Sequence, residues 1–158
     1  NIELKGVIPL EYRKAIGNRI FGCDDCQIVC PWNSYAKFTY EKAFQARLTT
    51  RSLTELIKLD DESFHKQFFK SPIKRIKRKG LIRNVAVALG NSQDPQAVAP
   101  LIKILKDKEP LIRSHAVWAL GELLGEKSLP VFDEHLAEEA EEMVLEEIRH
   151  IRNRKIKF

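Results

Sequence analysis

Apolar residues recur with a helical period along the chain from Ser52 onward. In the stretch that begins at Asp94-Pro95 they fall at i, i+3, i+4 and i+7, the spacing of one helix face: Val98, Leu101, Ile102 and Leu105. The stretch from Pro110 to Gly125 has the same kind of face, made by Ile112, Ala116, Ala119, Leu120 and Leu123. No stretch alternates clearly enough to predict a strand, so the pattern predicts a mainly α fold.

Helix-capping residues stand where the first of these helices are expected to begin. Ser52 and Glu55 have the spacing of a capping box, which predicts a helix through Leu59. Asp60 or Asp61 is expected to cap the next helix. That helix has three aromatic residues at helical spacing, which we expect in the core: Phe64, Phe68 and Phe69.

The longest predicted helix begins at Ser71-Pro72, a capping residue followed by proline at the first helical position. We expect it to end at Gly90-Asn91, and Gly80 is a candidate for a break or bend. Two further helices are predicted within residues 127–136 and 138–158.

The first 45 residues have a weaker pattern. A short helix is predicted from Pro9, with Gly17 and Asn18 stopping it. Residues 33–44 are expected to form either another short helix or an extended arm. This part of the chain is therefore predicted to be irregular, with short helical pieces.

An internal repeat links two of the predicted helices. Ala88-Leu89-Gly90 matches Ala119-Leu120-Gly121, and three apolar pairs follow at the same offset: Val98 with Leu129, Leu101 with Phe132, and Leu105 with Leu136. Each unit reads as helix, glycine turn, helix, and such a unit buries its apolar face only against a neighbour. The pattern resembles a short HEAT-type repeat, with Trp118 expected in its core.

Composition limits the class of protein. Hydrophobic residues make up 44% and charged residues 31% of the 158 residues, which supports a folded core. No apolar run is long enough to span a membrane, and the first residues do not read as a signal peptide. The chain lacks an initiator Met, so we expect it to be a piece of a longer protein. Its three cysteines are too few and too clustered for a secreted disulfide framework, which favours a cytoplasmic location.

The net charge of +5 is unevenly distributed. No acidic residue occurs between Glu62 and Asp94, and seven basic residues lie from Lys70 to Arg83: Lys70, Lys74, Arg75, Lys77, Arg78, Lys79 and Arg83. A basic stripe of this kind attracts polyanions, so these residues are candidate contacts to RNA phosphates. A solvated helix face is the alternative interpretation, and Arg83 with Asn84 could instead fix the turn at the start of the buried helix.

All three cysteines lie in "CDDCQIVCP", as Cys23-x2-Cys26-x3-Cys30-Pro31. A zinc site would need a second pair of ligands, and the four histidines are scattered along the predicted helices. Plain buried cysteines would not be expected to cluster beside two aspartates. Iron–sulfur ligands fit well, because bacterial ferredoxin runs end in Cys-x3-Cys-Pro. Asp24 and Asp25 are expected to cap the local turn rather than act in catalysis.

The segments "IGNRIFGCDDCQIVCPWN" and "SPIKRIKRKGLIRNVAVALGN", followed by HEAT-like units, closely resemble the epoxyqueuosine reductase family. This resemblance implies a cobalamin-dependent iron–sulfur oxidoreductase that completes queuosine at the wobble position of tRNA. It implies two [4Fe–4S] clusters in the parent protein, with Cys23 and Cys26 on one cluster and Cys30 on the other. It further implies that the remaining ligands, the cobalamin site and the catalytic acid lie outside this chain.

We therefore expect residues 1–45 to be the end of a ferredoxin-like 4Fe–4S domain and residues 46–158 to be a HEAT-like α-helical domain. No catalytic residue is predicted in this chain, which alone should be inactive. The expected partner is the tRNA anticodon stem-loop, and the expected state is a monomer. Two alternatives remain. One is a non-enzymatic HEAT-like scaffold that carries a small zinc or iron–sulfur site and binds protein partners, and the other is a ferredoxin-like electron carrier. His115 is expected to be a hydrogen-bonded structural residue, with RNA contact as the alternative.

Overall fold

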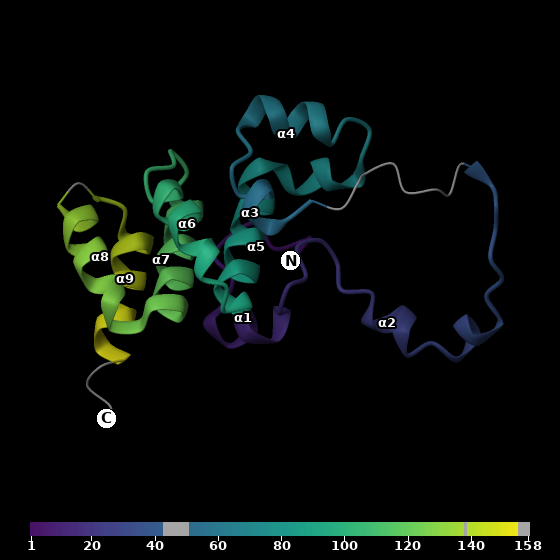
Figure 1. Ribbon diagram of the computed structural model, residues 1–158, viewed down its shortest axis with the longest axis horizontal. Helices are drawn as coiled ribbons and strands as arrows, with labels where there is room; N and C mark the ends of the chain where they lie inside the picture. Colours follow the sequence, from purple (N-terminus) through teal and green to yellow (C-terminus); the bar gives the residue numbers. More distant parts are fainter. Residues whose placement is uncertain (43–50, 138, 155–158) are drawn as a thin grey trace.

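The computed structural model describes residues 1–42, 51–137 and 139–154, and Figure 1 shows a stack of helices with a long arm at one end. The N-terminal part contains α1 (Leu10–Ile16), α2 (Asp25–Ile28) and the 3-10 helix η1 (Pro31–Tyr35). The stack contains α3 (Leu53–Leu56), α4 (Asp61–Gln67), η3 (Pro72–Ile76), α5 (Lys77–Ser92), η4 (Pro95–Ala97), α6 (Val98–Ile104), α7 (Pro110–Leu124), η5 (Gly125–Ser128), α8 (Leu129–Leu136) and α9 (Glu142–Arg154). The described residues contain no strand, which confirms the mainly α fold.

Several predicted caps are present. Ser52 and Glu55 form the reciprocal capping box at the start of α3. Asp60, rather than Asp61, caps α4 by accepting a hydrogen bond from the Ser63 N–H. These bonds satisfy amides that the helix itself leaves without partners, which is why the local sequence was enough to predict them.

The long helix predicted from Pro72 is instead two helices. The 3-10 helix η3 ends at Ile76, and Lys77 has a φ of 58°, so the break precedes Gly80. Gly80 itself is buried inside α5. The helix also passes through Gly90-Asn91, where an end was predicted, and continues to Ser92, with Gln93 in the left-handed conformation after it.

The glycines of the repeat are contact points between helices, not turns. A Cβ at Gly90 would lie 2.7 Å from Trp118 Cζ3 and 2.9 Å from Ala119 Cα, so α5 and α7 approach closely there. A Cβ at Gly121 would lie 2.6 Å from Ile151 Cδ1, which is the equivalent approach of α7 to α9. The repeat unit therefore positions helices α5, α7 and α9 side by side.

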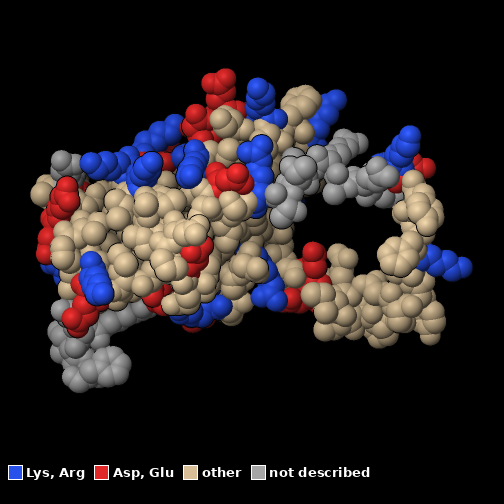
Figure 2. All heavy atoms as spheres, viewed as in Figure 1, with Lys and Arg blue, Asp and Glu red and all other residues tan. Residues whose placement is uncertain are grey.

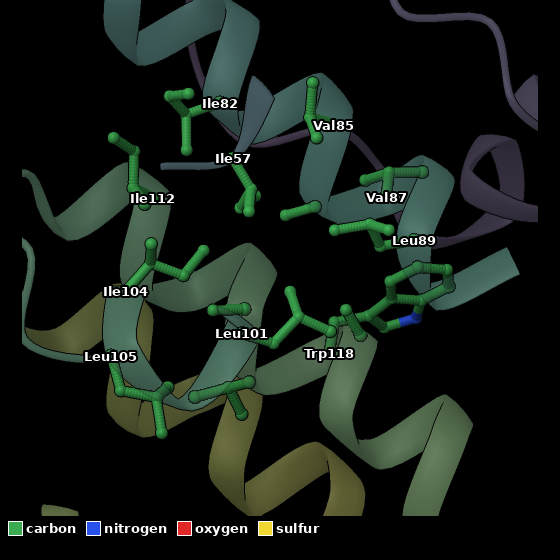
Figure 3. Close-up of a cluster of buried hydrophobic side chains, with 14 of the residues drawn as sticks. Ile57, Ile82, Val85, Val87, Leu89, Leu101, Ile104, Leu105, Ile112 and Trp118 are labelled. Carbon is green, nitrogen blue, oxygen red and sulfur yellow. The ribbon is translucent and has the colours of Figure 1, made fainter. Parts of the chain in front are cut away.

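The core runs between these helices. Figure 3 shows Ile57, Ile82, Val85, Leu89, Leu101 and Trp118 in one cluster of buried side chains, and all of these are at most 2% exposed. Two predictions of buried faces were wrong. Ile102 is 37% exposed because Ile104 takes the inward position on α6, and Phe69 is 67% exposed because it follows the last turn of α4.

The N-terminal segment packs against the helical stack. Ile8 is buried, and the Arg13 guanidinium forms two hydrogen bonds to Glu147 of α9, of 2.9 and 3.0 Å. Asn91 donates to the carbonyl oxygens of Arg13 and Gly17, at the end of α1. Residues of the first predicted domain are thus covered by the second, while the predicted boundary at 45/46 lies outside the described residues.

From α2 onward, the N-terminal part of the chain forms the arm. Figure 1 shows α2 on the arm, away from the stacked helices. Of the predicted 33–44 segment, residues 33–35 belong to η1 and residues 36–41 have no helical structure, so the short-helix and extended-arm interpretations each hold for part of it, and residues 43–44 lie outside the described residues. No helix in the described part of the chain is long and apolar enough to cross a membrane.

Candidate cluster loop and nucleic-acid interface

The three cysteines lie around the short helix α2. Cys23 precedes it, Cys26 is within it, and Cys30 follows it, immediately before Pro31 and η1. Cys23 and Cys26 are exposed, Cys30 is partly exposed, and none forms a disulfide. Three accessible thiols on one short loop are available to a metal centre, which plain buried cysteines would not be.

The turn around α2 is held by its backbone. Asp24 has a φ of 55°, and its carbonyl oxygen accepts hydrogen bonds from the amides of Gln27 and Ile28, both 2.9 Å. The Asp24 side chain makes no capping bond, and Asp25 pairs with Arg19 at 2.9 Å. The expectation that these carboxylates cap the turn was therefore wrong: a backbone carbonyl does so.

The three cysteine thiols fit part of the ligand set of an iron–sulfur site. A [4Fe–4S] cluster takes four cysteine ligands, and this chain has three cysteines. Among the described residues no group of three or more His, Cys, Asp and Glu side chains could hold one metal ion. Thiolates of this loop would therefore share a cluster with ligands that this chain does not supply.

A cavity of about 580 Å³ adjoins the cysteine loop. Cys23 and Asp25 lie on one side, and the other walls come from α1 and the first residues of the chain, including Ile2 and Ile16. Asn1 holds the segment from Arg19 to Gly22 in place, because its side chain donates to the Arg19 carbonyl and accepts from the Gly22 N–H. The start of the cysteine loop is thereby tied to the helical body.

Arg83 was grouped with the RNA contacts, and this prediction was wrong. Its side chain is fully buried, and its guanidinium donates to the backbone carbonyls of Asn1, Leu4 and Gly6 and to Asn84 Oδ1. The alternative that Arg83 and Asn84 fix a turn is not what the structure shows either, because both side chains instead hold the N-terminal segment through its backbone carbonyls.

Arg78 is also used inside the protein. Its side chain is 11% exposed, donates to the Leu59 carbonyl at 2.7 Å, and pairs with Asp107. Burial opposes the charge on Asp107, but the hydrogen bonds from Arg78 and from the Glu109 N–H outweigh it and lower the pKa of Asp107. Arg78 therefore links α5 to the α6–α7 turn, which contradicts its prediction as a free phosphate contact.

Five of the seven predicted basic residues remain at the surface: Lys70, Lys74, Arg75, Lys77 and Lys79. Arg75 pairs with exposed Glu3 at 2.7 Å, and Lys79 lies 3.6 Å from Glu109. Such exposed pairs are weak, so a phosphate could replace the carboxylates. Figure 2 shows Lys and Arg side chains along the edge of the molecule over α4 and α6, with acidic side chains among them.

Sequence reasoning missed Lys5. A hollow of about 320 Å³ is lined by Lys5, Arg75, Lys77 and Lys79, together with Leu4, Ile76 and Gly80. Lys5 reaches it because Arg83 holds the carbonyls of Leu4 and Gly6 on either side. No local signal in the sequence indicates this, since the partners are almost eighty residues apart.

Two family models match the chain. Residues 1–33 match a 4Fe-4S double cluster binding domain, and residues 78–151 match HEAT repeats. The two matches support the predicted order of an iron–sulfur segment followed by a helical repeat.

Curated relatives carry the name epoxyqueuosine reductase. The Escherichia coli K12 protein is 39% identical over 137 residues, which are 85% of this chain and 36% of that protein. The Pseudomonas aeruginosa protein is 46% identical over 125 residues, which are 75% of this chain and 34% of that protein. The chain thus spans about a third of the length of the relatives it matches.

Solved structures are similar as well. One is an epoxyqueuosine reductase with an epoxyqueuosine-modified stem loop of tyrosine tRNA, with a TM-score of 0.85 and 30% identity over 94% of this chain and 40% of that chain. The Streptococcus thermophilus enzyme has a TM-score of 0.78 and 26% identity over 97% of this chain and 41% of that chain.

Proposed function

The chain belongs to the epoxyqueuosine reductase family, and from this premise we propose that the whole protein reduces epoxyqueuosine to queuosine at the wobble position of tRNA. Removing the epoxide oxygen as water consumes two electrons and two protons. This chain contributes cluster ligands for electron delivery and a basic surface for the tRNA. The observation that carries the proposal is that both features occur on one chain that aligns with these enzymes over 75–85% of its length.

Cys23 and Cys26 hold one [4Fe–4S] cluster in this proposal, and Cys30 reaches a second one. Their accessibility and the absence of a disulfide support this assignment. Bound clusters supply one-electron transfer, with a potential set by burial and hydrogen bonding around the sulfur atoms. The other ligands, and the cobalamin implied by the family, belong to parts of the protein outside this chain.

The RNA contacts we propose are the exposed cations Lys74, Arg75, Lys77 and Lys79, now joined by Lys5. Their support is the shared hollow that four of them line, which is wide enough for a phosphate and has no carboxylate in its lining. Such contacts neutralise phosphates and release counterions, so the affinity should fall steeply with salt. A cytoplasmic, monomeric enzyme is part of the same proposal.

The cluster assignment is tested by metal content. The natural full-length polypeptide containing these residues is reconstituted anaerobically with iron and sulfide, and its iron content and visible absorbance are measured. Cys26→Ala should lower both relative to the unchanged protein, whereas Ser34→Ala, a matched change on the same exposed arm, should not. Zinc in place of iron, or an unaffected iron content in Cys26→Ala, would refute the assignment.

The RNA assignment is tested by charge reversal. Lys74→Glu with Lys77→Glu should weaken binding of an anticodon stem-loop and flatten the slope of log affinity against log salt concentration by about two units or more. Lys127→Glu, at an exposed residue of η5, is the control. An unchanged slope would show that this surface does not meet RNA, as the alternative of a non-enzymatic scaffold predicts.

A further inference from the structure

Phe69 is an aromatic side chain that the fold leaves outside its core. Phe64 and Phe68 of the same run are 1% and 3% exposed, whereas Phe69 is 67% exposed. The helix α4 ends before it, and Lys70 after it has a φ of 55°, a conformation that non-glycine residues rarely adopt. The chain direction is then fixed by Ser71, whose side chain accepts from the Ile73 N–H. Phe69 is thus held at the surface by ordered backbone on both sides.

Two ammonium groups lie over this ring. Lys70 Nζ is 5.5 Å and Lys74 Nζ is 5.9 Å from the ring centroid of Phe69. The ion pairs found among the described residues include neither Lys70 nor Lys74. The group is therefore an exposed aromatic face flanked by two cations whose charge is not neutralised by the protein.

We propose that Phe69 is a stacking platform for an unpaired base of the RNA loop, with Lys70 and Lys74 binding the phosphates on either side of that base. The inference rests on the proposed function, since it needs RNA to be the ligand. Every base has a face that can stack on an aromatic ring, and its own phosphates supply the anions that the two lysines lack. In the complex the base stacks on the ring of Phe69, and the two ammonium groups move outward to contact the RNA phosphates.

Charge favours RNA over a protein partner at this site. No Asp or Glu occurs between Glu62 and Asp94, and the hollow lined by Lys5, Arg75, Lys77 and Lys79 begins in the same stretch of chain, at the far end of η3. A polypeptide covering Phe69 would leave Lys70 and Lys74 to be neutralised by acids of its own. A nucleotide supplies both partners at once, a base that stacks on the ring and phosphates that neutralise the lysines.

The test uses the natural full-length polypeptide and an anticodon stem-loop in which each loop base is replaced in turn by fluorescent 2-aminopurine. Phe69→Ala should weaken binding roughly 5- to 100-fold, with the slope of log affinity against log salt unchanged. It should also abolish the fluorescence quenching at one loop position. Phe69→Tyr should retain both affinity and quenching, and Lys74→Ala should lower the salt slope by about one.

Tyr12→Ala, which removes an exposed aromatic side chain of α1, serves as the control and should bind normally. Normal affinity and quenching in Phe69→Ala would overturn the stacking site while leaving the RNA-binding function intact. If Phe69→Ala binds RNA normally but loses cluster content or stability, Phe69 contacts another part of the polypeptide, and the inference is wrong. Failure of the unchanged protein to bind the stem-loop would overturn the proposed function as well.

Discussion

At the scale of single residues, burial decides what each polar side chain does. His115 was considered for RNA contact, yet it is fully buried: its Nε2 accepts a hydrogen bond from the Ile8 N–H, so its Nδ1 carries the proton and donates to the Leu111 carbonyl. Burial, and next the positive charge of Arg13, lowers the pKa of His115 to about 3. The imidazole is therefore neutral in the folded protein and joins the N-terminal segment to α7.

This arrangement predicts a pH dependence of stability. The unfolded chain protonates His115 near pH 6.5 and the folded chain only near pH 3, so the unfolded state binds the extra proton between these values. His115 therefore adds no pH dependence above pH 6.5, and stability is lost as the pH falls below it. Between pH 7.5 and pH 5 the free energy of unfolding should fall by about 2 kcal/mol from this group.

Urea unfolding of the chain and of a His115→Gln variant across this range measures that contribution. The variant should have the flatter profile, because its amide cannot titrate, and other groups cancel in the comparison. Parallel profiles for the two proteins would contradict a neutral, buried His115.

At the scale of helices, the spacing between them depends on two glycines one repeat apart. Gly90 faces the Trp118 ring and the backbone of Ala119, while Gly121 faces the end of the Ile151 side chain. Backbone cannot move aside without shifting a helix, whereas an isoleucine side chain can adjust. The same repeat position should therefore tolerate an added Cβ poorly at Gly90 and better at Gly121.

Gly90→Ala should therefore lower the free energy of unfolding by about 2 kcal/mol, despite the better helix propensity of alanine. Gly121→Ala should cost less, about 1 kcal/mol or below, because Ile151 can move. Gly6→Ala, where a Cβ meets nothing within 4 Å, is the control and should stay within about 0.5 kcal/mol. Equal losses at Gly90 and Gly121 in urea unfolding would show that backbone proximity is not the cause.

At the scale of the whole molecule, the N-terminal segment is an integral part of the helical body. Arg13 and Glu147 are 134 residues apart in the sequence. Their side chains are nevertheless 1% and 7% exposed and form a salt bridge with two hydrogen bonds. The Arg13 guanidinium also lies 5.4 Å from the centroid of the Trp118 ring, next to the contact between α5 and α7. The cysteine loop therefore starts from a segment that is anchored in the repeat.

Glu147→Leu should destabilise the chain by about 3–5 kcal/mol, because it leaves the Arg13 charge buried without its carboxylate. The double variant Arg13→Met with Glu147→Leu should recover at least half of that loss, since both charges are then absent. Urea unfolding of the single and double variants gives the coupling between the two side chains. Additive losses would mean that the pair does not hold α1 to α9.

The sequence by itself determined the features that depend on neighbouring residues. The capping box at Ser52, the helix from Pro110 and the cysteine loop were all correctly located, because each is set by side chains a few positions apart. The basic run was found in the same way, and so was the repeat, since it recurs at one offset along the chain. These local patterns predicted the mainly α fold and the candidate chemistry.

Only the tertiary structure decided which of these residues are available. Arg83 and Arg78 belong to the basic run by sequence, but their guanidinium groups are hydrogen-bonded to carbonyls and a carboxylate of distant segments. Lys5 lies outside the run and still contributes to the basic surface. Phe69 shares a spacing with two core residues and still faces solvent. The physical reason is the same in each case: burial and hydrogen bonding depend on partners brought together by folding, and their positions are not encoded in the spacing of adjacent residues.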